Sequence, residues 1–251
     1  MLRYFKRVSS INFKSLGDQN LIIKWFPRSW IQIKVSEYVI YIDPSYMSTY
    51  FKKSNKKVIF SELEDDVLPE KLETGNLILI SHIHKDHCKE VTIKRLSDKN
   101  TIILTPKSYK KEADDNIRII TSKNEYQFDK ISIEIVNAYN TSEGASTRKV
   151  HKLGECVGYI INVDNKRIYF SGDTDLIPDM KDISNVDIAI VPIGGIFTMN
   201  INEAIEAMLS IKPKMVIPVH HLKENPLEFK TKLEQMGIDV LVLDIGEEKE
   251  L

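Results

Sequence analysis

The 251-residue chain contains little cysteine and no long apolar run. Its two cysteines, Cys88 and Cys156, form no C-x-x-C pair and are too few for a disulfide framework, so we expect a reducing, cytoplasmic location. No stretch reaches the roughly 18 consecutive apolar residues that a membrane-spanning helix needs, so no membrane association is expected. Charges are scattered through the N-terminal segment and interrupt any apolar stretch there, so we expect no secretory signal.

The sequence also lacks an excess of either charge. It has 35 Lys and Arg against 36 Asp and Glu, a formal net charge of −1, and its lysines are mixed with acidic residues along the chain. Because nucleic-acid-binding surfaces are usually clustered and basic, we expect no nucleic-acid partner. Internal repeats, low-complexity tracts and Pro/Gly/Ser-rich linkers are absent as well. Residues 1–251 are therefore expected to form one domain.

Short apolar segments bounded by turn residues predict strands in both halves of the chain. The uninterrupted run at residues 76–81 (NLILIS) is typical of a strand buried on both faces, whereas Ile131–Ala138 alternates between apolar and polar positions. Asp164 and Asn165 predict a tight hairpin turn between strands at 157–163 and 167–171. Further strands are expected at residues 30–35, 39–43, 101–105, 116–121, 186–192 and 215–220.

Two helices are predicted in the second half. Asn200 followed by Glu203 resembles an N-cap with its reciprocal acid and should open a helix that runs through Ile211. A second helix should begin near Pro226, which suits the first helical position, and end at Gly237. Since the predicted strands outnumber the helices and the helices lie between strands, we expect two sheets covered by helices.

Three of the six histidines and one aspartate follow directly after the strand at 76–81, in the segment S-H-I-H-K-D-H-C-K. At a strand end residues i and i+2 point to the same side, so His82 and His84 can hold one ion as a pair. The turn that follows can direct Asp86 and His87 toward a second ion nearby. Imidazole nitrogen with carboxylate oxygen suits zinc first, with manganese or iron as competitors. The alternative, histidines on a solvated turn, is disfavoured because so dense a cluster rarely arises by chance.

This H-x-H-x-D-H segment resembles the hallmark of the metallo-β-lactamase superfamily. The resemblance implies an α+β fold, a four-layer αβ/βα sandwich of two mixed sheets with helices outside and metals at one edge. The later P-I-G-G-I-F-T-M, followed by E-A and I-P-V-H, looks like the branch of ascorbate-6-phosphate lactonase-like proteins and uncharacterised metal-dependent hydrolases. A binuclear hydrolase is implied, one that attacks a small ester, lactone or related substrate, phosphorylated ones included, with a metal-bridging hydroxide.

The same resemblance assigns roles to three separate residues. Asp43 in Y-I-D-P looks like an aspartate that orients a ligand without touching metal, and Asp173 in S-G-D-T-D resembles the carboxylate that bridges both ions. His220 in I-P-V-H resembles the last ligand. Taken alone, each residue also suits a structural role: a turn for Asp43, a cap or turn for Asp173, and a satisfied core histidine for His220.

One part of the pattern is missing. Many relatives place the third histidine of the first site at the end of the strand I-E-I-V-N-A-Y-N, where this chain has Tyr139 and Asn140. The next histidine is His151, on a loop that is long enough to fold back, and we predict it as a ligand; a surface histidine is the alternative. His221, which follows a predicted ligand, is predicted to donate a proton or contact substrate, with Asp86 as the other catalytic residue. A supporting or surface role for His221 stays open.

Other classes of function are less well supported. No G-x-S-x-G segment occurs, so a serine nucleophile is not expected. Di-iron flavoprotein relatives carry a glutamate where this chain has His84, and nuclease relatives usually carry an inserted domain. A regulatory module that uses its metals structurally, and a phosphodiesterase or nuclease, remain the alternatives. Specificity is expected to lie in the loops at residues 46–54, 139–155 and 196–200.

Overall fold

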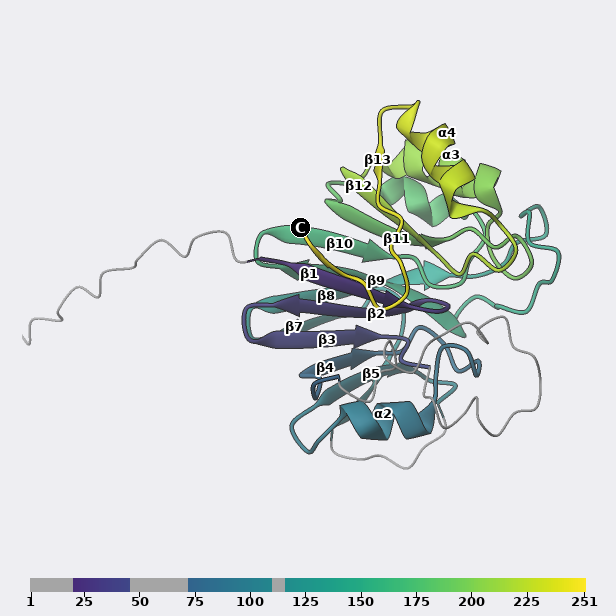
Figure 1. Cartoon of the computed structure of the whole chain (residues 1–251). Coiled ribbons are helices and arrows are strands. Elements are labelled where there is room, and N and C mark those ends of the chain that lie inside the picture. Colours follow the sequence, from purple (N-terminus) through teal and green to yellow (C-terminus); the bar gives the residue numbers. More distant parts are fainter. Residues whose placement is uncertain (1–19, 46–71, 110–115) are drawn as a thin grey trace, which may run out of the picture.

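Two mixed β-sheets are stacked in the computed structural model, which describes residues 20–45, 72–109 and 116–251 (Figure 1). The first sheet has the strand order β14-β1-β2-β3-β4-β5-β6, antiparallel from β14 to β3 and parallel from β3 to β6. Its strands are β1 (Ile22–Phe26), β2 (Trp30–Val35), β3 (Tyr38–Ile42), β4 (Leu77–Leu79), β5 (Ile102–Pro106), β6 (Ile117–Ile120) and β14 (Glu248–Glu250).

The second sheet has the order β13-β12-β11-β10-β9-β8-β7 and mirrors this plan. It is antiparallel from β7 to β10 and parallel from β10 to β13. Its strands are β7 (Glu125–Phe128), β8 (Ile131–Ala138), β9 (Cys156–Val163), β10 (Lys166–Phe170), β11 (Ile188–Pro192), β12 (Met215–Val219) and β13 (Asp239–Val240).

Apolar side chains fill three layers around these sheets. Between the sheets, Ile33 and Leu79 of the first pack in one buried cluster with Tyr159 and Phe170 of the second. Helix α2 (Glu90–Leu96) covers the outer face of the first sheet. Helices α3 (Ile201–Ile211) and α4 (Pro226–Glu234), with the 3₁₀ turn η3 (Pro178–Asp182), cover the outer face of the second. Figure 1 shows α2 and the α3/α4 pair on opposite sides of the sheets. The predicted α+β sandwich with four layers is confirmed.

Several local predictions are confirmed as well. Asp164 and Asn165 both have positive φ, 48° and 60°, and form the two-residue turn between β9 and β10. The Asn200 side chain caps α3 by accepting the N–H of Glu203 at 2.9 Å. The predicted return bond from Glu203 to the helix start is replaced by another contact, because its carboxylate accepts the N–H of Ala145 at 2.8 Å. This glutamate therefore ties α3 to a distant loop.

The prediction omitted β1, β7, β13, β14 and α2. Helix α2 has seven residues, and Lys89, which precedes it, is not an N-cap residue type because an ammonium group cannot accept a backbone N–H. Strand β14 is fully exposed, so its side chains carry no alternating apolar pattern, and it pairs with β1 through backbone groups and the ion pair of Lys24 with Glu248 at 2.6 Å. Such elements depend on the partner strand or sheet for their existence.

The sheet topology places the carboxyl ends of several strands at one edge. Strands β3 and β4 are parallel neighbours, as are β10, β11 and β12. Polar residues that follow these strands consequently meet at the same edge of the sandwich. Within the described part of the chain, no helix is long and apolar enough to cross a membrane.

Candidate metal centre

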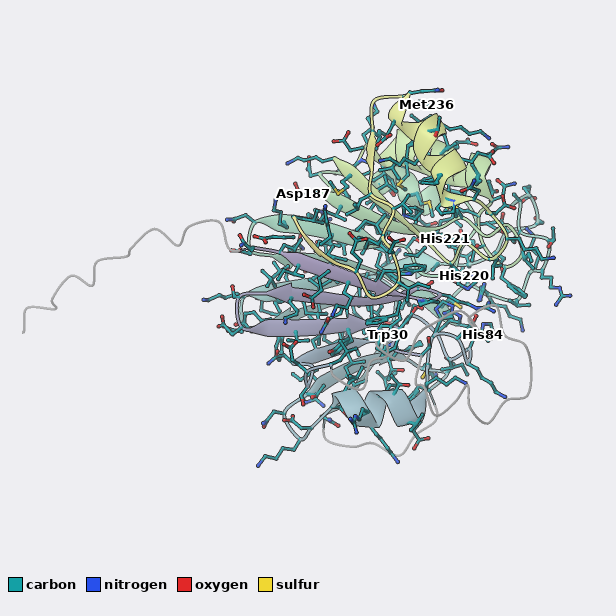
Figure 2. All side chains as sticks on the ribbon, viewed as in Figure 1. Trp30, His84, Asp187, His220, His221 and Met236 are labelled. Atoms are coloured by element: carbon teal, nitrogen blue, oxygen red, sulfur yellow. The ribbon has the colours of Figure 1, made fainter. Side chains whose placement is uncertain are left out.

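Loops at one edge of the two sheets carry the predicted site residues. His82 and His84 follow β4 in the first sheet, whereas Asp173 follows β10 and His220 follows β12 in the second. Figure 2 shows His84, His220 and His221 at this edge and Asp187 at the opposite end of the strands. The site is therefore shared between both sheets.

A first group of donors consists of His82, His84 and His151, whose nearest ring nitrogens all lie within 4.8 Å of one another. Nδ1 of His84 and Nε2 of His151 are 3.1 Å apart. His82 and His151 are buried and His84 is exposed. Because zinc binds imidazole nitrogen at about 2.0–2.1 Å, nitrogens this close can share one ion. The loop after β8 thus brings His151 to the two histidines of the motif.

A second group consists of Asp86, His87 and His220, again with donor atoms within 4.8 Å of one another. Oδ2 of Asp86 lies 3.6 Å from Nε2 of His220 and 4.0 Å from Nε2 of His87. His87 and His220 are buried, whereas the Asp86 side chain is 37% exposed. This arrangement leaves Asp86 at the mouth of the site.

The carboxylate of Asp173 lies between the two groups. Its Oδ2 is 3.2 Å from Nε2 of His87, 3.5 Å from Nε2 of His220 and 3.7 Å from Nε2 of His151. The preceding Gly172 has a φ of +66°, and a Cβ there would lie 2.5 Å from the carbonyl oxygen of Val157. Only glycine fits this turn, which directs Asp173 toward both groups.

Asp43 supports the histidines from behind. Its Oδ2 lies 2.8 Å from Nδ1 of His87 and accepts the Ser81 hydroxyl at 2.6 Å, while its Oδ1 accepts the Ser81 N–H at 2.7 Å. The Ser81 Oγ is in turn 2.9 Å from Nδ1 of His82. Hydrogen bonds to Nδ1 orient both rings and leave each Nε2 for the centre. Asp43 also lies within reach of a cation with His82 and His87, yet both its oxygens already have partners.

Burial and neighbouring charges set the ionisation of the groups at the site. Burial alone would lower the pKa of His87, but the Asp173 and Asp43 carboxylates raise it well above its usual value. Burial lowers the pKa of His82 far below its usual value, so its ring is neutral and can act as a ligand. Although burial opposes ionisation, His220 and His87 hold the pKa of Asp173 well below its usual range. An ionised carboxylate thus remains buried among imidazoles.

Some buried polar atoms of this cluster lack a hydrogen-bond partner within the described part of the chain. They are Nε2 of His82, Nε2 of His87, Oδ1 of Asp173 and both ring nitrogens of His220. A buried polar atom left unpaired costs about 1–3 kcal/mol, and a bound cation would supply the missing partner. The imidazole and carboxylate donors present therefore fit divalent transition metals, zinc among them.

Arg28 is a site residue that the sequence analysis missed. Its Nη1 donates to Oδ2 of Asp86 at 3.0 Å, and its carbonyl oxygen accepts the His220 N–H at 2.9 Å. The residue lies between β1 and β2, far from every motif residue in the sequence. A Pro-Arg pair in a turn carries no signal of its own, so only the folded chain identifies it.

His221 lies beside the two donor groups and is a member of neither. Its Nε2 is 2.7 Å from the Pro218 carbonyl oxygen, and its ring centroid lies 5.2 Å from that of Trp25 at a tilt of 33°. Burial lowers the pKa of this histidine. The neutral ring therefore donates Nε2–H to Pro218 and carries its free lone pair on Nδ1.

Two of the three predicted specificity loops lie next to each other. The N–H of Arg148 in the loop 139–155 donates to the Ile196 carbonyl of the loop 196–200 at 2.7 Å, and the Phe197 carbonyl reaches Nδ1 of His151 at 3.1 Å. The third predicted loop, residues 46–54, lies outside the described residues, as does the N-terminal segment for which no secretory signal is expected.

Known proteins resemble the chain in both sequence and structure. A metal-dependent hydrolase of the UPF0173 family from Thermococcus onnurineus is 33% identical over 195 residues, covering 73% of this chain and 84% of that one. Another UPF0173 metal-dependent hydrolase, from Methanopyrus kandleri, is 28% identical over 241 residues, covering 91% and 99%. The crystal structure of a protein from Parabacteroides distasonis, assigned to the metal-dependent hydrolases, has a TM-score of 0.75 at 27% identity and covers 89% of this chain and 93% of its own.

The family model described as a beta-lactamase superfamily domain matches residues 22–220. This span begins at β1 and ends at His220, so it includes every strand-end residue of the two donor groups. The order of the motifs, the two mixed sheets and the shared edge agree with it. The chain belongs to the metallo-β-lactamase superfamily and, within it, to the UPF0173 family of metal-dependent hydrolases.

Proposed function

We propose that the protein hydrolyses a small ester, lactone or related substrate, phosphorylated ones included, at a pair of divalent cations. The observation that carries this proposal is the position of Asp173, whose Oδ2 contacts histidines of both donor groups. A carboxylate between two groups of imidazoles is the arrangement expected for two neighbouring cations. We propose zinc as the first candidate, with manganese or iron as competitors.

His82, His84 and His151 would hold one cation, and Asp86, His87 and His220 the other. Two such cations, when bound, would lower the pKa of a shared water and polarise the scissile bond. The residues around them supply orientation, because Asp43 and Ser81 fix the rings from behind.

Asp86 is the proposed catalytic carboxylate at the mouth. His220 and His87 hold its pKa below its usual value against the opposing effect of burial, and Arg28 donates to the same oxygen that faces them. An ionised carboxylate in this position accepts a hydrogen bond from the attacking water and orients it. Arg28 in turn limits the rotation of that carboxylate.

For His221 the two predicted roles differ in the proton they require. Since Nε2–H is engaged with Pro218, the neutral ring has no proton to give from Nδ1. This arrangement supports contact with substrate, in which Nδ1 accepts a hydrogen bond. A role as proton donor would require the ring to be protonated first, which its lowered pKa opposes.

The test combines metal analysis with a substrate panel. Purified protein is analysed for metal by mass spectrometry and assayed against lactones, phosphorylated lactones and phosphodiesters, together with the variants His82→Ala and Asp173→Ala. Loss of metal and of hydrolysis together is expected in both variants. Asp187→Ala, at the opposite end of the strands, is the control and should retain both (Figure 2). Full metal content in both site variants would contradict the proposal.

A separate assay addresses the nucleic-acid alternative. Binding of single-stranded RNA is measured at low and high salt, because phosphate contacts make such binding strongly salt-dependent. Weak binding that does not change with salt is expected for a hydrolase of small molecules. Tight binding that weakens steeply with salt would favour a nuclease instead.

A further inference from the structure

The loop between β8 and β9 delivers His151, and Asn140 holds the base of that loop. Oδ1 of Asn140 accepts the N–H of Val150 at 3.0 Å and the N–H of His151 at 2.9 Å. The backbone N–H of Asn140 donates to the His151 carbonyl at 2.8 Å. One residue at the end of β8 therefore fixes the backbone of His151 from both sides.

The same side chain also reaches the group that orients the His151 ring. Nδ2 of Asn140 donates to the Phe197 carbonyl at 2.8 Å, and this carbonyl lies 3.1 Å from Nδ1 of His151. A carbonyl accepts only from Nδ1–H, so the ring carries its lone pair on Nε2. That nitrogen faces His84 at 3.1 Å and Asp173 at 3.7 Å.

The orientation of the Asn140 amide follows from these partners. Two N–H groups require the oxygen on one side, and a carbonyl requires the NH₂ group on the other. With both ends occupied, the side chain is not available as a metal ligand. Asn140 acts on the histidine that the loop returns, His151, through these hydrogen bonds.

Other contacts, which do not involve Asn140, hold the rest of the loop in place. The fully buried Asp175 carboxylate accepts the N–H of Thr141 at 2.9 Å and the ammonium group of Lys149 at 3.0 Å. A Cβ at Gly144 would lie 2.2 Å from Oδ2 of Asp175, which shows how closely the loop packs there. Glu203 of α3 adds its bond to Ala145. Because these contacts do not involve Asn140, its replacement should leave the loop in place.

We propose that Asn140 is a positioning residue for the metal centre: it sets the backbone of His151 and, through the Phe197 carbonyl, the direction of its ring. The consequence for metal binding rests on the proposed function, whereas the hydrogen bonds themselves do not. Its effect should fall on the donor group of His82, His84 and His151. None of the hydrogen bonds that the structure describes for Asn140 reaches the group of Asp86, His87 and His220.

The first experiment titrates metal-free protein with zinc in the presence of a competing chelator. Asn140→Ala should lower the affinity for one of two zinc ions by about tenfold or more, as is usual when a group that orients a ligand is lost. The affinity for the other ion should stay unchanged. Asn140→Asp keeps the acceptor for Val150 and His151 but places an oxygen against the Phe197 carbonyl, so weaker binding of the same zinc ion is expected there too. The control is Asn76→Ala, which removes a side chain that accepts the Val39 N–H at 2.8 Å in the first sheet.

The second experiment records imidazole nitrogen–proton spectra of the metal-free protein. The wild type should show a protected Nδ1–H signal of His151, which Asn140→Ala should lose and Asn76→Ala should keep.

Retention of that signal in Asn140→Ala would overturn the inference, as would unchanged affinity for both zinc ions. If Asn140→Ala weakened the binding of both zinc ions equally and melted at a lower temperature than Asn76→Ala, Asn140 would have a purely structural role. That result would also overturn the inference. If the wild type binds no zinc, the proposed function fails, and the spectra still decide the role of Asn140.

Discussion

Nε2 of His87, which follows a strand of the first sheet, lies 3.2 Å from Oδ2 of Asp173, which follows a strand of the second. This contact joins the local H-x-H-x-D-H motif to the rest of the site. It also brings a buried carboxylate and a buried imidazole together without any other side chain between them.

Asp43→Asn should weaken metal binding while the fold is kept. The amide has nearly the shape of the carboxylate, but it cannot provide the same negative charge 2.8 Å from Nδ1 of His87. Loss of such a supporting group typically lowers metal affinity about 10–100-fold. Competition with a chelator measures the change. Asp98→Asn, in an exposed turn where the carboxylate accepts the Asn100 N–H, is the control and should bind metal like the wild type.

Removal of metal should destabilise the protein. The unpaired nitrogens of His82, His87 and His220 come together only in the folded chain, so a metal present at 100 times its Kd should add about 2.7 kcal/mol to the free energy of unfolding. Calorimetry with and without a chelator measures the difference in Tm. In His82→Ala the difference should shrink. An identical Tm for the wild type with and without chelator would argue against a metal centre.

Tyr159→Phe should lower stability and leave the site chemistry unchanged. The buried hydroxyl of Tyr159 donates to the Ile80 carbonyl at 2.6 Å and so links the two sheets. Its loss leaves that carbonyl unpaired, at a cost of about 1–3 kcal/mol. Urea titration measures this cost. Tyr126→Phe removes an exposed hydroxyl bonded to Ile119 and should change stability by a few tenths of a kcal/mol, about the usual limit for exposed positions. Equal effects in both variants would show that burial does not matter here.

His221→Gln should retain metal and lose activity. Glutamine can still donate to the Pro218 carbonyl, but it cannot reproduce the ring that packs against Trp25 and offers Nδ1 to a substrate. We expect kcat/KM to fall by about tenfold, because one hydrogen bond to substrate is worth roughly 1 kcal/mol and the packing against Trp25 is lost as well. Metal analysis and kinetics on the best substrate of the panel check this. Wild-type activity would remove His221 from the site.

Part of the site could be predicted from local spacing alone. His82 and His84 stand two positions apart after a buried strand, and that spacing turns both side chains to one side. Asp86 and His87 follow within the next turn. These residues are close together in the sequence, so their arrangement as metal ligands can be predicted before any fold is known.

Other residues became part of the site only through the order of the strands. Asn140 belongs to no sequence motif. Its role depends on Val150, ten positions later, folding back to it and on the Phe197 carbonyl, which follows β11. Arg28 reaches Asp86 because the turn between β1 and β2 lies over the same edge. No spacing in the sequence encodes these contacts.

Local sequence patterns were enough to predict the alternating and uninterrupted apolar segments, the Asp164–Asn165 turn, the cap at Asn200 and the dense group of histidines after β4. These features follow from interactions between residues a few positions apart. The sequence indicates the roles of Asp173 and His151 only through a family resemblance and the reach of a loop, and it gives no signal for β14; their positions come from the tertiary structure. Such contacts depend on how two sheets stack and on which strand ends share an edge, and this is a property of the whole chain.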